Sequence, residues 1–204
     1  MTSTSDAGDV LRPLRAATGE LHQHLDSRLP IARSDATLLD YVDHLRTLRP
    51  WLLKQQRVLA RPAVPALDAA SRRIHQKLIA LDADLHEAGV PSPSLDVLAG
   101  RLPDAPPEPE AFAWGAAYVV EGSQLGGVVM RKRLGARLAP HPMRYFAAAG
   151  AGTPGLHWQA FVGQLGTALT TPAAIEAAQS GAIASFEDLI AGFNTSGLLT
   201  AVAA

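Results

Sequence analysis

Two stretches of this chain carry residue types whose spacing could support chemistry. The first is the segment 112–133, FAWGAAYVVEGSQLGGVVMRKR, which has the pattern of a long helix yet contains four glycines. A glycine inside a helix costs about 1 kcal/mol relative to alanine, so the four need a physical reason. At about 100° per residue, Gly115 lies about 20° from Gly122 around the helix, and Gly126 lies about 40° from Gly122. One face of this helix therefore has bare backbone, and we expect a flat or bulky group close to it.

Two kinds of group could occupy this face, and the spacing leaves both open. Small residues at this spacing let a neighbouring helix approach closely. The alternative is a planar cofactor that lies on the glycines and leaves room for a small molecule. The pair Gly126-Gly127 in the middle of the helix also favours a bend there.

The second stretch is a helix predicted over 10–28, which contains His22 and His24. These histidines lie about 200° apart, so they cannot face the same pocket, and the apolar stripe lies midway between them. Arg15 lies about 20° from His22 and about 10 Å along the axis, roughly the distance from a haem iron ligand to a group that binds a propionate. The alternative is a structural histidine on the flank of the helix.

The other histidines are expected to have structural roles. His44, His75, His86 and His141 lie among charged or loop residues and are predicted at the surface. His157 stands beside Trp158 and is predicted to be a packing residue.

The composition predicts one globular domain. The chain has 204 residues, of which 48% are hydrophobic and 18% charged, and its net charge of -1 argues against nucleic acid as the main partner. The absence of cysteine excludes disulfides, zinc-thiolate sites, iron–sulfur clusters and a thiolate-ligated haem. The first residues do not resemble a signal peptide and no apolar run could span a membrane, so we expect a cytoplasmic protein. We expect a disordered tail over 1–9, a helical domain over 10–196 and a C-terminal tail over 197–204.

Hydrophobic periodicity predicts an all-α fold, because no sustained period-two pattern of β-branched residues occurs. Pro13 is expected in the first turn of its helix, and Pro50 could kink the second helix. The predicted helices are 10–28, 35–61, 65–88, 92–100, 112–133, a short one within 140–150, 156–169 and 171–193, with a proline-rich connector at 102–110.

The two stretches together resemble a known family. LRAATGELHQHLD, residues 14–26, and YVVEGSQLGG, residues 118–127, are similar to the proximal and distal helix motifs of the biliverdin-producing haem oxygenases. Among these, the chain looks most like the bacterial members associated with phytochromes. The resemblance implies a single-domain helical bundle in which His22 is the axial ligand of the haem iron. It also implies that Gly122 and Gly126 contact the haem from its other face.

The resemblance further implies an enzyme that uses O2 to cleave haem to biliverdin, iron and CO. Haem is then both substrate and cofactor, and the implied catalytic residues are Gly122, Ser123 and Gly126. The residues implied to bind haem are His22, Arg15, Gly122, Gly126, Gly127, Tyr118 and Lys132. Because the sequence has no flavin or nicotinamide motif, electrons would come from a separate ferredoxin, flavodoxin or reductase. A bacterial phytochrome is a possible acceptor of the biliverdin.

Two departures from the family pattern keep other functions open. Ser123 stands where animal members carry an aspartate that orders water, and residues 145–204 contain no Lys or Arg. Arg15 and the cluster Arg131-Lys132-Arg133 would therefore do more of the propionate binding, although that cluster could also be only a solvated helix end. The alternatives are a haem-binding protein without turnover, a scaffold whose glycines pack a helix, and a non-haem enzyme on the same architecture.

Overall fold

The regular elements of this protein are helices throughout the residues that the structure describes. The structure is a computed structural model that describes residues 7–91, 106–148 and 154–199. The all-α prediction is confirmed, whereas the predicted helix 92–100 and residues 102–105 of the connector 102–110 fall outside the described residues. The helices are α1 (Ala7–Asp26), the 3-10 helix η1 (Pro30–Ala32), α2 (Leu38–Ala60), α3 (Pro65–Glu87), α4 (Pro109–Leu134), α5 (Arg144–Ala148), α6 (Pro154–Ala168) and α7 (Pro172–Thr195).

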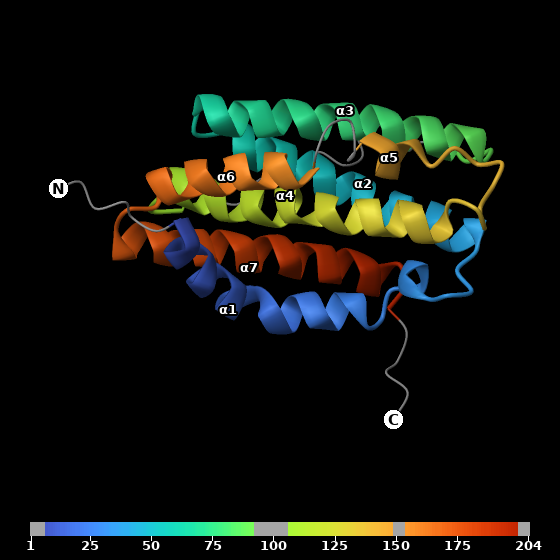
Figure 1. Ribbon diagram of the computed structural model, residues 1–204, viewed down its shortest axis with the longest axis horizontal. Helices are drawn as coiled ribbons and strands as arrows, with labels where there is room; N and C mark the ends of the chain where they lie inside the picture. Colours follow the sequence, from blue (N-terminus) through green and yellow to red (C-terminus); the bar gives the residue numbers. More distant parts are fainter. Residues whose placement is uncertain (1–6, 92–105, 149–153, 200–204) are drawn as a thin grey trace.

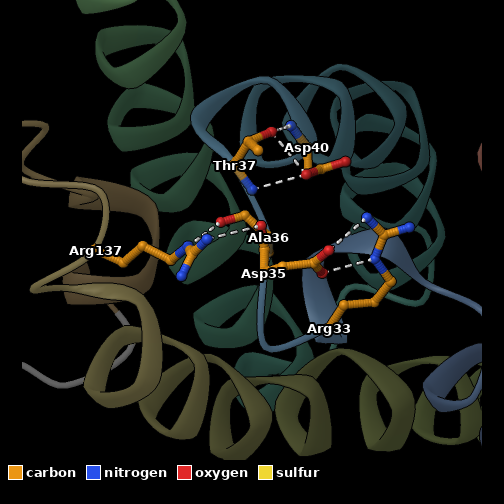
Figure 2. A network of polar contacts seen from close by, with 6 residues as sticks. All are labelled: Arg33, Asp35, Ala36, Thr37, Asp40 and Arg137. Carbon is orange, nitrogen blue, oxygen red and sulfur yellow. Dashed lines mark hydrogen bonds and ion pairs between the residues drawn. The ribbon is translucent and has the colours of Figure 1, made fainter.

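Local capping chemistry explains where the prediction of helix ends was wrong. α2 begins at Leu38 rather than at residue 35, because Thr37 forms a capping box with Asp40 (Figure 2). Thr171 caps α7 by accepting a hydrogen bond from the Ala174 N–H. α1 begins before the predicted position, so Pro13 lies inside the helix and not in its first turn. None of the described helices has both the length and the apolarity that a membrane crossing requires.

The helices form a bundle in which α4 is central (Figure 1). α4 packs most extensively on α7, and α1 packs chiefly on the opposite side of α7. The colours of Figure 1 show that α1, α3, α4 and α7 run in one direction and that α2 runs in the other. α1 and α4 are therefore parallel helices that share α7 as a common neighbour.

The backbones of α4 and α7 come very close together where the two helices cross. A Cβ atom built on Gly115 would collide with the backbone carbonyl of Ala178, and a Cβ atom on Gly181 would collide with that of Phe112. At Gly115 the bare backbone therefore accommodates a helix and not a cofactor. Of the two alternatives that the spacing left open, the neighbouring helix is the one found at this position.

A buried carboxylate joins α2, α3 and α5. Asp84 is fully buried and accepts hydrogen bonds from the Tyr41 hydroxyl at 2.7 Å and from the Tyr145 N–H at 2.8 Å. Burial and the bond to Asp84 raise the pKa of the Tyr41 hydroxyl above its ordinary value. His141 was predicted at the surface, but it is half-buried and its Nε2 lies 3.2 Å from the backbone carbonyl oxygen of Asp84.

His44 is also not a surface residue. Its ring stacks on Phe193 with ring centroids 5.3 Å apart, and burial lowers the pKa of the imidazole to about 4. The sequence did not indicate this position because the neighbours of His44 in sequence are charged, while its neighbours in space come from α5 and α7. The surface prediction is confirmed for His75 and His86, both of which are exposed.

The turn after α4 is fixed to the start of α2. Arg137 donates from Nε to the Ala36 carbonyl oxygen at 3.0 Å and from Nη2 to that of Asp35 at 3.3 Å (Figure 2). A cavity of about 580 Å³ opens beside Arg137, lined by Ala36, Thr37, Leu38, Glu87, Arg137, Leu138, Ala139, Pro140 and His141. It contains none of the site residues predicted from the sequence.

Candidate functional site

His22 is placed on α1 so that one ring nitrogen is engaged and the other can bind a ligand. Its side chain is 63% exposed, and its Nδ1 lies 3.0 Å from the carboxylate of Asp26, one turn further along α1. The ring also meets Phe186 of α7 edge-on, with centroids 5.9 Å apart. A carboxylate on one imidazole nitrogen fixes the tautomer and the ring orientation, which leaves Nε2 as the nitrogen that could coordinate a metal.

The glycines of α4 have three different surroundings. A Cβ atom on Gly122 would lie 3.7 Å from the ring of Trp158, an ordinary contact with α6. A Cβ atom on Gly126 would meet no described atom within 4 Å, so the space beside this residue is open. Gly127 is buried. Of the two groups considered for the glycine face, a helix occupies the space at Gly115, and only Gly126 offers free space for a ligand.

One exposed apolar side chain lies on the side of α4 that carries the open position. Val129 is 61% exposed and lies about 60° from Gly126 around the helix, whereas Leu125 and Val128, each 37% exposed, lie about 100° and 160° from it. An exposed apolar side chain beside a free glycine is a surface that an apolar ligand could cover.

The positions of His22 and of the α4 glycines can be compared along α7, because α1 and α4 both contact α7 at known residues. Gly181 marks the crossing with Gly115, and Phe186, which meets His22, lies five residues or about 8 Å beyond Gly181. On α4, Gly122 lies seven residues or about 10 Å beyond Gly115 in the same direction. His22 and Gly122 are therefore at similar levels of the bundle, on the two helices that flank α7.

The other predicted site residues on α4 are less directly placed. The Ser123 hydroxyl donates to the Val120 carbonyl oxygen at 2.7 Å within its own helix, and the residue is exposed. Its oxygen can still accept a hydrogen bond from water. Tyr118 is half-buried, and its ring centroid lies 5.9 Å from that of Trp158, so it packs towards α6.

The basic residues predicted to bind propionates lie on the surface. Arg15 is exposed on α1, two residues after Pro13, whose carbonyl oxygen accepts a hydrogen bond from Gln179 of α7. Lys132 is exposed in the last turn of α4, between Arg131 and Arg133. Both side chains are therefore accessible to an anionic group from solvent.

The sequence analysis missed a buried carboxylate that stands directly before Gly122. Glu121 is 2% exposed and accepts hydrogen bonds from Arg73 of α3 and Gln124 of α4. It also lies 2.9 Å from the Nε2 atom of His157, so His157 is a hydrogen-bond partner of this carboxylate and not only a packing residue. A glutamate within an apolar helix was the signal that the sequence offered.

The different surroundings of the glycines predict opposite effects of the same substitution on stability. Gly115→Ala should lower the free energy of unfolding by about 1–3 kcal/mol, because the new methyl group meets the backbone of Ala178. Gly126→Ala should raise it by up to about 1 kcal/mol, because the site is open and alanine favours the helix. Urea denaturation of both variants measures the difference. Equal effects would mean that α4 and α7 do not cross as described.

Comparison with known proteins was made once this geometry was established. The chain matches the crystal structures of the NO- and CO-bound haem oxygenase from Neisseria meningitidis with a TM-score of 0.68, over 95% of this chain and 94% of that one, at 23% identity. The chain has the haem oxygenase fold. No family model matches the sequence.

A relative in sequence points to the same family. The chain is 39% identical over 106 residues to a haem oxygenase from Xanthomonas campestris pv. campestris (strain 8004). This match covers 50% of this chain and 61% of the relative, so the chain matches less than two thirds of the relative's length. The resemblance to haem oxygenases is confirmed by these two comparisons, which do not bear on the phytochrome-associated group.

Proposed function

We propose that this protein is a haem oxygenase, which uses O2 and external electrons to cleave haem to biliverdin, iron and CO. The observation that supports the proposal is that, on the haem oxygenase fold, α1 carries an exposed histidine with one ring nitrogen free for a ligand, and α4 carries a glycine, Gly126, with open space beside it. This arrangement provides an iron ligand on one side and room for a small molecule on the other.

Each residue in the arrangement has a task that its surroundings support. His22 would bind the iron through Nε2, and Asp26 would keep the ring in the required tautomer. When bound, haem supplies both the iron that binds O2 and the carbon framework that is oxidised. Gly122 and Gly126 would leave space for O2, with Gly127 allowing a bend, and the Ser123 oxygen would hold a water molecule near that space.

The edge of the site would be completed by basic and aromatic side chains. Arg15 or Lys132 would bind the haem propionates, since both are exposed cations on the helices of the site; they lie towards opposite ends of the bundle, so only one of them would face the propionate edge. Tyr118 would support the haem from the side of α6, where it packs on Trp158.

The proposed partners follow from what the reaction needs. Electrons would come from a ferredoxin, a flavodoxin or a reductase, because the sequence has no flavin or nicotinamide motif of its own. We place the protein in the cytoplasm and in the phytochrome-associated group, with a bacterial phytochrome as the biliverdin acceptor.

A second candidate is a protein that binds haem without cleaving it. The observation in its favour is that the Ser123 hydroxyl already donates its proton to the Val120 carbonyl oxygen, so it does not supply a proton to a ligand in this conformation. The two functions differ in turnover and not in binding.

The first test is haem binding followed by reduction. We expect purified protein to bind one haemin per chain with a Soret band typical of histidine ligation, and to form biliverdin when ascorbate is added. Arg15→Glu should weaken haemin binding or change the biliverdin isomer, because a carboxylate would repel a propionate. A Soret band without biliverdin would favour the non-catalytic protein, and no Soret shift at micromolar haemin would exclude both.

A further inference from the structure

Glu121 lies at the centre of a buried polar cluster on the side of α4 that faces α3 and α6. Its Oε1 accepts two hydrogen bonds from Arg73, from Nη2 at 2.7 Å and from Nε at 3.0 Å. Its Oε2 accepts from the Gln124 Nε2 at 2.8 Å and lies 2.9 Å from the His157 Nε2. One carboxylate thus connects three helices, and both of its oxygens are engaged.

The surroundings of this carboxylate are cationic. Lys77 follows Arg73 by one turn of α3 and is 5% exposed. Burial lowers the pKa of its amine to about 8, and the negative charge of Glu121 opposes that shift. Removing the charge of Glu121 would take away the carboxylate that pairs with Arg73 and that favours the charged form of the buried Lys77, so the cluster depends on this group.

The cluster is connected to the glycines through two consecutive pairs of residues. Glu121 pairs with His157, and the next residue of each helix forms the contact between Gly122 and Trp158. On the helical wheel, the Glu121 side chain points about 140° away from the direction of Gly126. Glu121 therefore cannot touch a ligand beside Gly126, but it fixes the segment of α4 that carries both glycines.

From this arrangement we infer that Glu121 is a positioning residue, which sets the place of the α4 glycines by joining α4 to α3 and α6. The expected effect of Glu121 on turnover rests on the proposed haem oxygenase function. The role of Glu121 in holding α4 against α3 and α6 does not, because it concerns the protein without haem. Because a misplacement of about 1 Å can cost a reaction about 100-fold in rate, the position of these glycines matters to turnover.

The first experiment uses the haem-free protein and Glu121→Gln, which keeps the shape of the side chain and removes its charge. Trp51 and Trp114 are buried and Trp158 is half-buried, so quenching of tryptophan fluorescence by acrylamide reports mainly on Trp158. In the variant, the quenching constant should rise roughly twofold and amide hydrogen exchange at 122–127 should accelerate about tenfold.

Asp84→Asn is the matched control, because Asp84 is an equally buried carboxylate that joins α2, α3 and α5 and, among the described residues, forms no hydrogen bond with α6. When each protein is measured the same number of degrees below its own melting temperature, Asp84→Asn should have the same quenching constant and the same exchange rates at 122–127 as the wild type. If Glu121→Gln does not fold, His157→Phe removes only the bond to α6 and should give the same two changes. The inference would be overturned if Glu121→Gln, or His157→Phe where Glu121→Gln does not fold, showed the quenching constant and the exchange rates of the wild type. It would also be overturned if Asp84→Asn showed changes of the same size.

The second experiment tests the consequence for turnover. Glu121→Gln should lower kcat for biliverdin formation about tenfold and change haemin affinity by no more than about threefold, whereas Asp84→Asn should leave both unchanged. An unchanged kcat in Glu121→Gln would overturn the catalytic part. If even the wild type forms no biliverdin, the proposed function fails, while the measurements on the haem-free protein still decide whether Glu121 positions α4.

Discussion

Replacing His22 by alanine should abolish biliverdin formation. His22 Nδ1 is engaged by Asp26 and its ring rests on Phe186, so Nε2 is held in a defined direction from α1. Loss of a residue that only orients a metal ligand costs about 10–100-fold, and loss of the ligand itself should cost at least about 100-fold in turnover. Absorption spectra should show loss of the histidine-ligated haem, and added imidazole should partly restore the spectrum by filling the gap.

His24→Ala is the matched control for this prediction. His24 lies two residues away on the same helix, is half-buried, and points about 200° away from His22. The variant should keep the wild-type haem spectrum and form biliverdin, with at most a small change in stability. Should His24→Ala lose the iron ligand instead, the assignment of the proximal histidine would be wrong.

Replacing Gly126 by leucine should separate haem binding from haem cleavage. No described atom lies within 4 Å of the position that a Cβ atom would take, so the new side chain fits without disturbing the fold. It would fill the space proposed for O2 and its water, so turnover should fall about 100-fold while haemin affinity changes by less than about tenfold. Haemin titration and product chromatography measure the two effects separately.

Gly163→Leu controls for the general effect of a leucine at an exposed helical glycine. Gly163 is exposed on α6, and a Cβ atom there also meets no described atom within 4 Å. This variant should retain both haemin binding and turnover. If Gly126→Leu produces biliverdin at the wild-type rate, the open space at Gly126 is not where O2 binds.

The sequence was sufficient for the helical class and for most helix boundaries, because apolar periodicity and capping residues act locally. The sequence was not sufficient to predict which groups lie against the glycine face of α4. Gly115, Gly122 and Gly126 share one side of a helical wheel, but α7, Trp158 and open space occupy that side in turn. A helical wheel shows on which side of a helix a residue lies. It does not show which neighbouring helices cover that side, or how far along it they extend.

The same limit explains the residues whose surroundings the sequence did not indicate. His44 and His141 have charged or loop neighbours in sequence and His157 has apolar ones, yet their partners are Phe193, the Asp84 carbonyl and the carboxylate of Glu121. Each of these contacts joins residues that are far apart in the chain. Motif spacing within a single helix selected His22 over His24, whereas pairing between helices required the fold.

The common direction of α1, α3, α4 and α7 affects the electrostatic potential at one end of the bundle. The C-terminal end of a helix carries about −0.5 of an elementary charge and the N-terminal end about +0.5. α1, α3, α4 and α7 end on the same side of the molecule and α2 begins there, so negative helix ends outnumber positive ones at this end (Figure 1). Arg131, Lys132 and Arg133 occupy the last turn of α4 at this end. The negative end of α4 itself offsets about 0.5 of their formal positive charge, so an anionic ligand is attracted less than a count of basic side chains indicates.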